Sequence, residues 1–269
     1  VYKRQGINHM AWLLEISRNG EDLYPIIRKR AQEGPIYAPT LALRELHPEY
    51  ADRIPSVAEQ FTPDNHHDMV RFEIMKQFGY FVTESSEHSS EYYPWFIKKD
   101  HPELIDRFHI PLDEYPRRCR DQIARWKQQA EHLVHNENLT HTRSSEYAAG
   151  IIEALETGRT FGFAGNVLNT GLIDNLPFDA CVEVSCMVNE GHLSPCHMGP
   201  LPNQLAALNR RQIEVHQLTV DAALTRKKEY IYQAAMLDPH AGSELTIDEI
   251  RSLVDDLIQA HGDWLPEYH

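Results

Sequence analysis

Two groups of polar and aromatic side chains in this sequence could carry out chemistry. The first is the run GINHMAW at residues 6–12, in which His9 follows directly after Asn8. An imidazole at the end of a strand can bind a metal ion, and a neighbouring amide can meet a substrate hydroxyl. The same His9 could instead be a core residue with satisfied hydrogen bonds, which is the reading that its spacing alone favours.

The second group is the segment 79–95, GYFVTESSEHSSEYYPW. It combines three carboxylates, one His, three Tyr and four Ser just after an expected helix. Aromatic rings can cover the apolar face of a sugar, while carboxylates and amides read its hydroxyls, so this mixture is typical of a sugar site. Proton transfer needs positioned groups with tuned pKa values, for which Tyr80, Glu84 and His88 are the candidates. The alternative is a solvated surface loop.

Two further segments carry weaker signals. Residues 163–171 contain Asn166 and Asn169 among glycines, residues that permit unusual backbone angles and present amides, although a plain turn explains them equally well. The pair Cys196–His197 matches no zinc-binding spacing, which favours a packing role. No nucleophile elbow, Walker loop or dinucleotide fingerprint is present in the sequence.

Composition narrows the class of protein. The 269 residues suffice for one large domain or two small ones, and 42% of them are hydrophobic. A net charge of −14 argues against a nucleic-acid partner, because phosphate binding relies on a surplus of Lys and Arg. No apolar run approaches the roughly 18 residues of a membrane helix, so no membrane partner is expected. Four cysteines without a disulfide framework indicate a reducing, cytoplasmic setting.

Hydrophobic periodicity predicts the elements that must position these groups. In the first part of the chain it predicts a strand at 6–17, helices at 23–33, 41–51, 68–78, 116–137 and 144–157, and a polar loop at 85–90. The helix at 116–137 carries the apolar stripe Ile123, Trp126, Ala130 and Leu133. The N-terminal residues 1–5 show no strand, cap or signal-peptide pattern. They correspond to the codons GTG-TAT-AAG-AGA-CAG, which we expect from the transposon end used in sequencing libraries, so we interpret them as an artefact.

The second part of the chain has a different pattern. It predicts a strand at 159–164, a Gly/Asn-rich loop at 165–175, an alternating strand through Val182, Val184 and Cys186, and the longest helix at 209–236. Thr246 and Glu249 form a capping-box signature for a last helix, which Gly262 ends. These patterns together predict one helix-rich α+β domain with a few antiparallel strands.

The ordered motifs resemble a known family. GINHMAW, RFEIMKQFGYFVTESSEHSSEYYPWFIK, GNVLNTGLIDNLPFDACVEV, PLPNQLAALNRRQIEVHQLTVDAAL and MLDPHAGSELTIDEIRSLVDDLIQAHGDWLP are similar to the C-terminal part of glycoside hydrolase family four. The similarity is greatest to its α-galactosidase branch and covers nearly all of the chain from Gly6. It implies an α+β domain of the lactate-dehydrogenase-like type, in which residues 6–269 form the substrate-binding and oligomerisation domain.

The resemblance also implies a reaction that differs from that of two-carboxylate glycosidases. NAD⁺ oxidises the C3 hydroxyl of the sugar, a base removes the C2 proton that the new ketone acidifies, and the C1 leaving group is eliminated before water adds. Mn²⁺ holds the C2 and C3 oxygens. The implied cofactors are therefore NAD and Mn²⁺, the implied substrate is an α-galactoside, and a homo-oligomer is expected.

Site residues are transferred one by one. His9 matches the family's metal-binding His, and Asn8 matches the Asn beside it. The base, a Tyr or an Asp in the family, follows the helix at 68–78, where Tyr80 and Glu84 are the candidates and Tyr80 is preferred. His88, Glu91, Asn166 and Asn169 match motif positions expected near the substrate.

Departures from the family pattern define what this chain should lack. The N-terminal Rossmann domain and the Cys that completes the metal site are missing from the sequence, so the chain alone is expected to be inactive and to hold at most half of a metal site. A family member acting on α-glucosides, α-galacturonides or 6-phosphoglycosides is an alternative, although the acidic segment 79–95 disfavours a phosphate group. A non-catalytic fragment that oligomerises is the other alternative.

Overall fold

The computed structural model describes residues 2–33, 68–136, 138 and 146–269. Within them, seven strands form one sheet with the order β3-β2-β1-β6-β5, to which β4 and β7 are added at β2 and β6. The strands are β1 (Tyr2–Ile7), β2 (Met10–Arg18), β3 (Glu21–Asp22), β4 (Phe81–Val82), β5 (Phe161–Leu168), β6 (Cys181–Asn189) and β7 (His192–Pro195). All pairings are antiparallel, and the combination of this sheet with many helices confirms the predicted α+β class.

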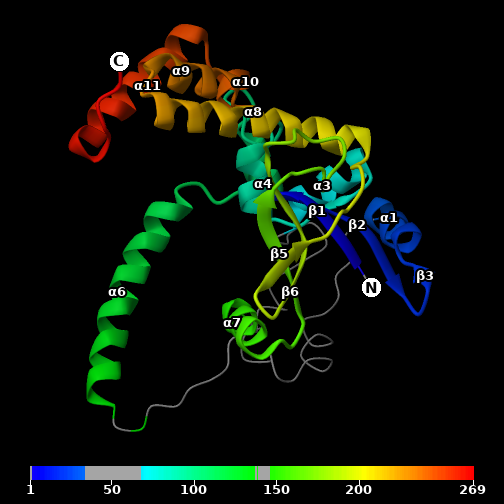
Figure 1. Ribbon diagram of the computed structural model, residues 1–269. Helices are drawn as coiled ribbons and strands as arrows, with labels where there is room; N and C mark the ends of the chain where they lie inside the picture. The colour runs from blue at the N-terminus through cyan, green and yellow to red at the C-terminus, as the bar shows by residue number, and fades with distance from the viewer. Residues whose placement is uncertain (1, 34–67, 137, 139–145) are drawn as a thin grey trace.

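The helices surround the sheet and extend beyond it (Figure 1). They are α1 (Tyr24–Glu33), α3 (Met69–Phe78), α4 (Ser86–Tyr92), α5 (Glu103–Phe108), α6 (Glu114–His135), α7 (Ala148–Thr157), α8 (Asn203–Thr225), α9 (Lys228–Leu237), α10 (Ala241–Glu244) and α11 (Ile247–His261), followed by the 3-10 turn η3 (Gly262–Trp264). None of the helices in the described ranges is both long and apolar enough to cross a membrane. The predicted helix at 41–51 lies outside the described residues.

The N-terminal segment is a hairpin, so the prediction of one strand over residues 6–17 was wrong. Ile7 pairs with Met10, which makes Asn8 and His9 a two-residue turn, and His9 has a left-handed φ of 63°. A Cβ at Gly6 would lie 2.6 Å from the carbonyl oxygen of Met10, so only glycine allows the strands to approach this closely. The run contains none of the Asn-Gly or Asp-Gly pairs that usually mark such a turn.

Residues 2–5 belong to β1, which contradicts the expectation that the first five residues carry no strand. Gln5 is fully buried, and its Nε2 donates to the Gly199 carbonyl at 3.2 Å. Arg4 forms an ion pair with Glu183 on β6. The interpretation of these residues as an artefact stays a prediction, since their packing does not reveal their origin.

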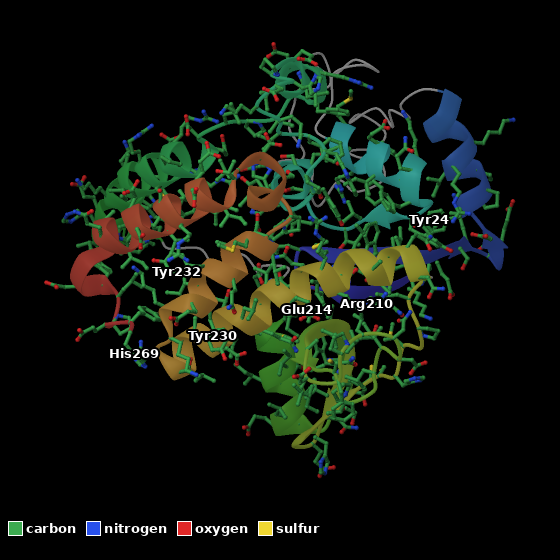
Figure 2. The ribbon with its side chains drawn as sticks, turned by 90° about the horizontal axis from the view of Figure 1, so that it is seen from above. Tyr24, Arg210, Glu214, Tyr230, Tyr232 and His269 are labelled. Atoms are coloured by element: carbon green, nitrogen blue, oxygen red, sulfur yellow. The ribbon has the colours of Figure 1, made fainter. Side chains whose placement is uncertain are left out.

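Two patterned elements of the second half confirm their predictions, whereas the strand predicted at 159–164 continues as β5 to Leu168, into residues predicted as a loop. On β6, Val182, Val184, Cys186 and Val188 are buried and their neighbours are more exposed, as the alternation predicts. Thr246 and Glu249 form the complete capping box of α11. The predicted long helix at 209–236 is instead two helices, because Arg226 takes a left-handed φ of 62° and the chain turns back between α8 and α9. Figure 2 shows Tyr232 of α9, whose hydroxyl donates to Asp255 of α11 at 2.5 Å.

Two predictions on the first half need correction or extension. Residues 85–90, predicted as a polar loop, begin the helix α4, with Ser85 as its N-cap. The helix predicted at 116–137 exists as α6, but none of its residues is buried, and Ile123 and Trp126 of its apolar stripe are 59% and 60% exposed. In Figure 1, α6 stands apart from the body of the molecule.

Helix α8 is tied to the hairpin by one buried amide. The indole N–H of Trp12 donates to Oδ1 of Asn209 at 2.7 Å, and Nδ2 of Asn209 donates to the Met10 carbonyl at 2.9 Å. Trp12 and Asn209 are both fully buried, so water cannot replace either bond. The carbonyl of Met10 immediately follows the turn that carries His9, so this amide fixes the position of the turn.

We expect the substitution Asn209→Ala to destabilise the fold. It leaves the buried Trp12 N–H without its partner and removes one hydrogen bond of the Met10 carbonyl, at a cost of about 1–3 kcal/mol for the unsatisfied N–H. Urea denaturation should therefore show a lower free energy of unfolding at an unchanged m-value. Asn203→Ala, at an exposed position at the start of the same helix, is the matched control and should change stability little. Equal stability of the two variants would contradict the role of Asn209.

Candidate functional site

The turn that carries His9 lies against the start and the face of α4. His9 Nε2 is 3.9 Å from a carboxylate oxygen of Glu84, and His9 Nδ1 shares a hydrogen bond of 3.2 Å with the Tyr92 hydroxyl. The His88 ring stands edge-on to His9, with 5.0 Å between the ring centroids. Two imidazoles, a carboxylate and a phenol therefore meet at one place, although they come from segments about 80 residues apart in the chain.

Strand β4 brings Glu84 to this turn. Trp12 pairs with Val82 across β2 and β4, and Thr83 donates from both its backbone N–H and its hydroxyl to the Ala11 carbonyl. Glu84 is the next residue, so its position beside the hairpin turn follows from strand pairing. Its carboxylate also accepts from the Ser85 N–H at 2.8 Å, which limits the directions in which it can point.

Helix α4 then presents His88 and Tyr92 on one face. The two residues are four positions apart, the spacing that places side chains next to each other on a helix. The Ser85 hydroxyl accepts from the His88 N–H at 3.2 Å and lies 3.0 Å from Nδ1 of the same residue. Ser85 thus caps the helix and fixes the His88 ring at the same time.

The environment of Tyr92 keeps its hydroxyl protonated. Burial is the largest effect that raises the pKa of Tyr92, and the carboxylates of Glu91, Glu84 and Asp238 raise it further. A protonated phenol beside a neutral imidazole can either donate to Nδ1 or accept from it. When Nδ1–H donates to Tyr92, the lone pair of His9 Nε2 faces Glu84 and is available to a ligand, which is the usual arrangement around metal-binding imidazoles.

The described part of the chain does not contain a complete metal site. No group of three or more His, Cys, Asp or Glu side chains there could hold a metal ion. His9 can provide one nitrogen ligand, and the remaining ligands would have to come from elsewhere. The role of His9 as a metal ligand stays a prediction.

The structure brings together only some of the predicted site residues. Glu84 and His88, which belong to the second predicted group, lie beside His9 of the first. Tyr80, the preferred base, packs against the Tyr24 ring at 5.6 Å between centroids and lies under the guanidinium of Arg28. Asn8 is exposed in the hairpin turn, and Glu91 is exposed on α4.

Asn166 on β5 and Asn169 in the loop after it differ in burial. Asn166 is exposed and pairs with Glu183 in the sheet. Asn169 is fully buried: its Nδ2 lies within 3.1 Å of the carbonyls of Ile173, Leu176 and Pro177, and its Oδ1 accepts from two backbone N–H groups. These bonds use the hydrogen-bonding capacity of the amide. A substrate could contact Asn169 only by displacing a bond that shapes the loop.

The cysteine and histidine cluster of the second half has a structural explanation. Cys186 is buried in the sheet, and all four cysteines are free. His197 pairs with Asp174 at 2.7 Å, which joins two exposed loops. The packing role was predicted for Cys196 and His197, of which Cys196 is half-buried and His197 holds a surface contact.

Sequence reasoning did not select Ser85 and Tyr92, which orient His88 and His9. Their signal was present in the sequence. A Ser followed by seven residues of mixed polarity can be an N-cap, and a helix from residue 86 would have placed His88 and Tyr92 on one face. The density of polar groups favoured a loop and concealed this spacing.

Comparison with known proteins adds the following findings. Residues 5–241 match the family 4 glycosyl hydrolase C-terminal domain. An alpha-galactosidase of Bacillus subtilis is 55% identical over 263 residues, which cover 98% of this chain and 55% of that protein. The chain thus spans about half the length of this curated relative.

Two solved structures share the fold at low identity. A 6-phospho-alpha-glucosidase from gut microorganisms, in complex with NAD and glucose-6-phosphate, has a TM-score of 0.70 at 18% identity, over 100% of this chain and 57% of that chain. A 6-phospho-beta-glucosidase from Thermotoga maritima, with manganese, NAD⁺ and glucose-6-phosphate, has a TM-score of 0.65 at 16% identity, over 100% of this chain and 55% of that chain.

We expect Ser85→Ala to loosen the first turn of α4. Loss of an N-cap hydroxyl costs about 1 kcal/mol, and His88 loses the partner of its Nδ1. Chemical denaturation should show this decrease in the free energy of unfolding. Ser252→Ala, at an exposed position within α11, is the control and should be neutral or slightly stabilising because alanine has the higher helix propensity. A decrease of the same size in both variants would contradict the capping role.

Proposed function

The chain belongs to glycosyl hydrolase family 4, as its ordered motifs predict, and we propose that it is the C-terminal half of an α-galactosidase that requires NAD⁺ and Mn²⁺. Its identity to the alpha-galactosidase of Bacillus subtilis supports the substrate class. The complexes of two relatives with NAD, one of them also with manganese, support the cofactors. The observation that carries the proposal is the meeting of His9, Glu84, His88 and Tyr92 at the hairpin turn.

The proposed reaction is hydrolysis by oxidation at C3, elimination and addition of water. Bound NAD⁺ supplies the hydride acceptor for C3, and a divalent cation offsets the charge that develops on the C2 and C3 oxygens. His9 would contribute its Nε2 to that cation in the tautomer whose Nδ1–H donates to Tyr92. Once C3 is a ketone, the C2 proton is acidic enough for a carboxylate or a phenolate to remove.

Glu84 is the better candidate for the base that removes this proton. A general base has to lie within hydrogen-bond reach of the proton that it takes, and Glu84 lies beside His9. Tyr80 is held by Tyr24 and Arg28 on another part of the sheet edge. His88, oriented by Ser85, is available to hydrogen-bond a sugar hydroxyl. Asn8, Glu91 and Asn166 are exposed and remain candidates for substrate binding.

Local charge favours a neutral sugar over a phosphorylated one. Glu84 lies beside His9, and the charges of Glu84 and Glu91 also act on Tyr92, so negative charge at the site opposes a phosphate dianion. Two basic residues near the site along the chain are already paired, Lys76 with Glu73 and Lys98 with Glu244. The same charges oppose the carboxylate of a galacturonide. The cytoplasmic setting expected from the free cysteines suits an NAD-dependent enzyme.

The isotopic composition of the product distinguishes this reaction from direct displacement. We expect the enzyme made with both halves, supplied with NAD⁺ and Mn²⁺, to release galactose with deuterium at C2 when it acts in D₂O, because the C2 proton is lost to solvent. The 269-residue chain alone should release no galactose. Mass spectrometry and NMR measure the label, and free galactose incubated with the same enzyme corrects for later exchange. Galactose without label at C2 would contradict the mechanism but not the assignment to the family.

Substitutions in the enzyme with both halves decide between the two bases. We expect Glu84→Gln to lower kcat by about 10²–10⁴-fold, the usual contribution of general acid–base catalysis. Tyr80→Phe should keep kcat within about tenfold, because the ring that packs against Tyr24 and Arg28 is retained. Initial rates on an α-galactoside measure both. A larger loss of kcat for Tyr80→Phe than for Glu84→Gln would identify Tyr80 as the base.

A further inference from the structure

The junction between β4 and α4, which carries Glu84, has little regular structure of its own to hold it. Strand β4 is two residues long, and in the described part of the chain it pairs only with β2. The carbonyls on its outer edge therefore have no neighbouring strand to supply hydrogen-bond donors. Other groups have to satisfy them if Glu84 is to keep one position beside His9.

Arg71, in the first turn of α3, supplies these donors. Its Nε donates to the Val82 carbonyl at 3.2 Å, and its Nη2 donates to the Thr83 carbonyl at 3.3 Å. Val82 and Thr83 are the two residues that precede Glu84. The planar fork of a guanidinium can bind two carbonyls at once in a fixed geometry, which the single ammonium of a lysine cannot do.

Two further contacts hold the guanidinium of Arg71 in place. Its Nη1 donates to a carboxylate oxygen of Asp68 at 2.8 Å, and its Cζ lies 4.2 Å from the centroid of the Phe81 ring. Asp68 occupies the N-cap position of α3, but its side chain makes no capping bond and binds Arg71 instead. The Arg71 side chain is only 20% exposed, so its direction is set by contacts within the protein.

The backbone of Arg71 reaches the other end of the same junction. Its N–H belongs to the first turn of α3, where no carbonyl of the helix can accept from it, and it donates to the buried Ser86 hydroxyl at 3.4 Å. Helix α3 packs beside α4, as Figure 1 shows. Arg71 therefore contacts the chain immediately before Glu84 and again two residues after it.

We propose that Arg71 is a positioning residue for the base, an inference that rests on the function proposed above. Its guanidinium fixes the backbone at residues 82–83, and this backbone sets the position of the Glu84 carboxylate relative to His9. A misplacement of about 1 Å can cost about 10²-fold in rate. Loss of the bonds from Arg71 therefore lowers kcat, although Arg71 itself takes no part in the proton transfer.

The variant Arg71→Lys tests this role in the enzyme made with both halves. Lysine keeps a charge beside Asp68 and an apolar stem over Phe81, but it cannot bind both carbonyls in the geometry of the guanidinium. We expect kcat on an α-galactoside to fall by about 10–10²-fold, with KM within about threefold of the wild-type value because the groups that bind the sugar are retained. Lys76→Met is the control. It removes a basic residue of the same helix that pairs with Glu73, and it should leave kcat unchanged.

A double-mutant cycle separates positioning of the base from loosening of the fold. In the Glu84→Gln background, Arg71→Lys should lower kcat by at most about threefold further, because the carboxylate that it positions is already gone. A substitution that only reduces the folded fraction would lower kcat by the same factor in both backgrounds. Asp68→Asn keeps an acceptor for the guanidinium but not the charge that holds it, so it should lower kcat less than Arg71→Lys does.

The outcomes for Arg71 and for the proposed function are distinguishable. Wild-type enzyme that releases galactose without deuterium at C2, or a Glu84→Gln variant that keeps its kcat, would contradict the proposed reaction or its base, and the inference with it, before any substitution of Arg71. Where both of those results are as expected, a wild-type kcat for Arg71→Lys would overturn the inference alone. An equal loss of kcat from Arg71→Lys in the two backgrounds would overturn it as well.

Discussion

The position of His9 depends on one buried amide that joins the two ends of the chain. Asn209 of α8 binds the Trp12 indole and the Met10 carbonyl, and both bonds lie in the core. His9 needs this support because a non-glycine residue with a left-handed φ of 63° costs on the order of 1–3 kcal/mol unless its surroundings hold it there. On the other edge of β2, Thr83 binds Ala11 and adds a second restraint. The site is therefore built by tertiary contacts around a turn that local sequence does not favour.

The difference between local signals and tertiary contacts explains which elements could be predicted from the sequence. The alternation of β6 and the capping box of α11 are local signals, and both are correct in the structure. The hairpin at Asn8–His9 was missed because its turn has no local signature and depends on Asn209, about 200 residues away. The break at Arg226 was missed for a similar reason, since the packing of α9 back onto α8 offsets the cost of a left-handed arginine. Periodicity also located α6, but it could not tell whether the stripe faces the core or a partner.

Residue types located the site better than they assigned its roles. The polar segment 79–95 does reach His9, so composition selected two segments that meet in the structure, and their role as a site stays a prediction. The roles depend on which way each side chain points: Asn166 and Asn169 are equivalent in composition, yet one is exposed and the other holds a loop through backbone hydrogen bonds. Tyr80 and Glu84 differ in the same way: they lie on either side of β4, and the bonds from Thr83 to Ala11 bring only Glu84 beside the hairpin turn. The direction of each side chain could be predicted only if the start of the helix at Ser85 were known.

The site is connected to the arm α6 and to the C-terminal helices through α4 and the segment that follows it. Arg118 of the arm pairs with Glu87 of α4, but the Arg118 side chain is 49% exposed, and exposed ion pairs contribute at most about 1 kcal/mol. On the other side, Glu244 of α10 binds both the Lys98 ammonium and the Lys99 N–H, and it is only 15% exposed. The charge of Asp238, which precedes α10, also reaches Tyr92. The stronger restraint on the site therefore comes from the C-terminal helices rather than from the arm.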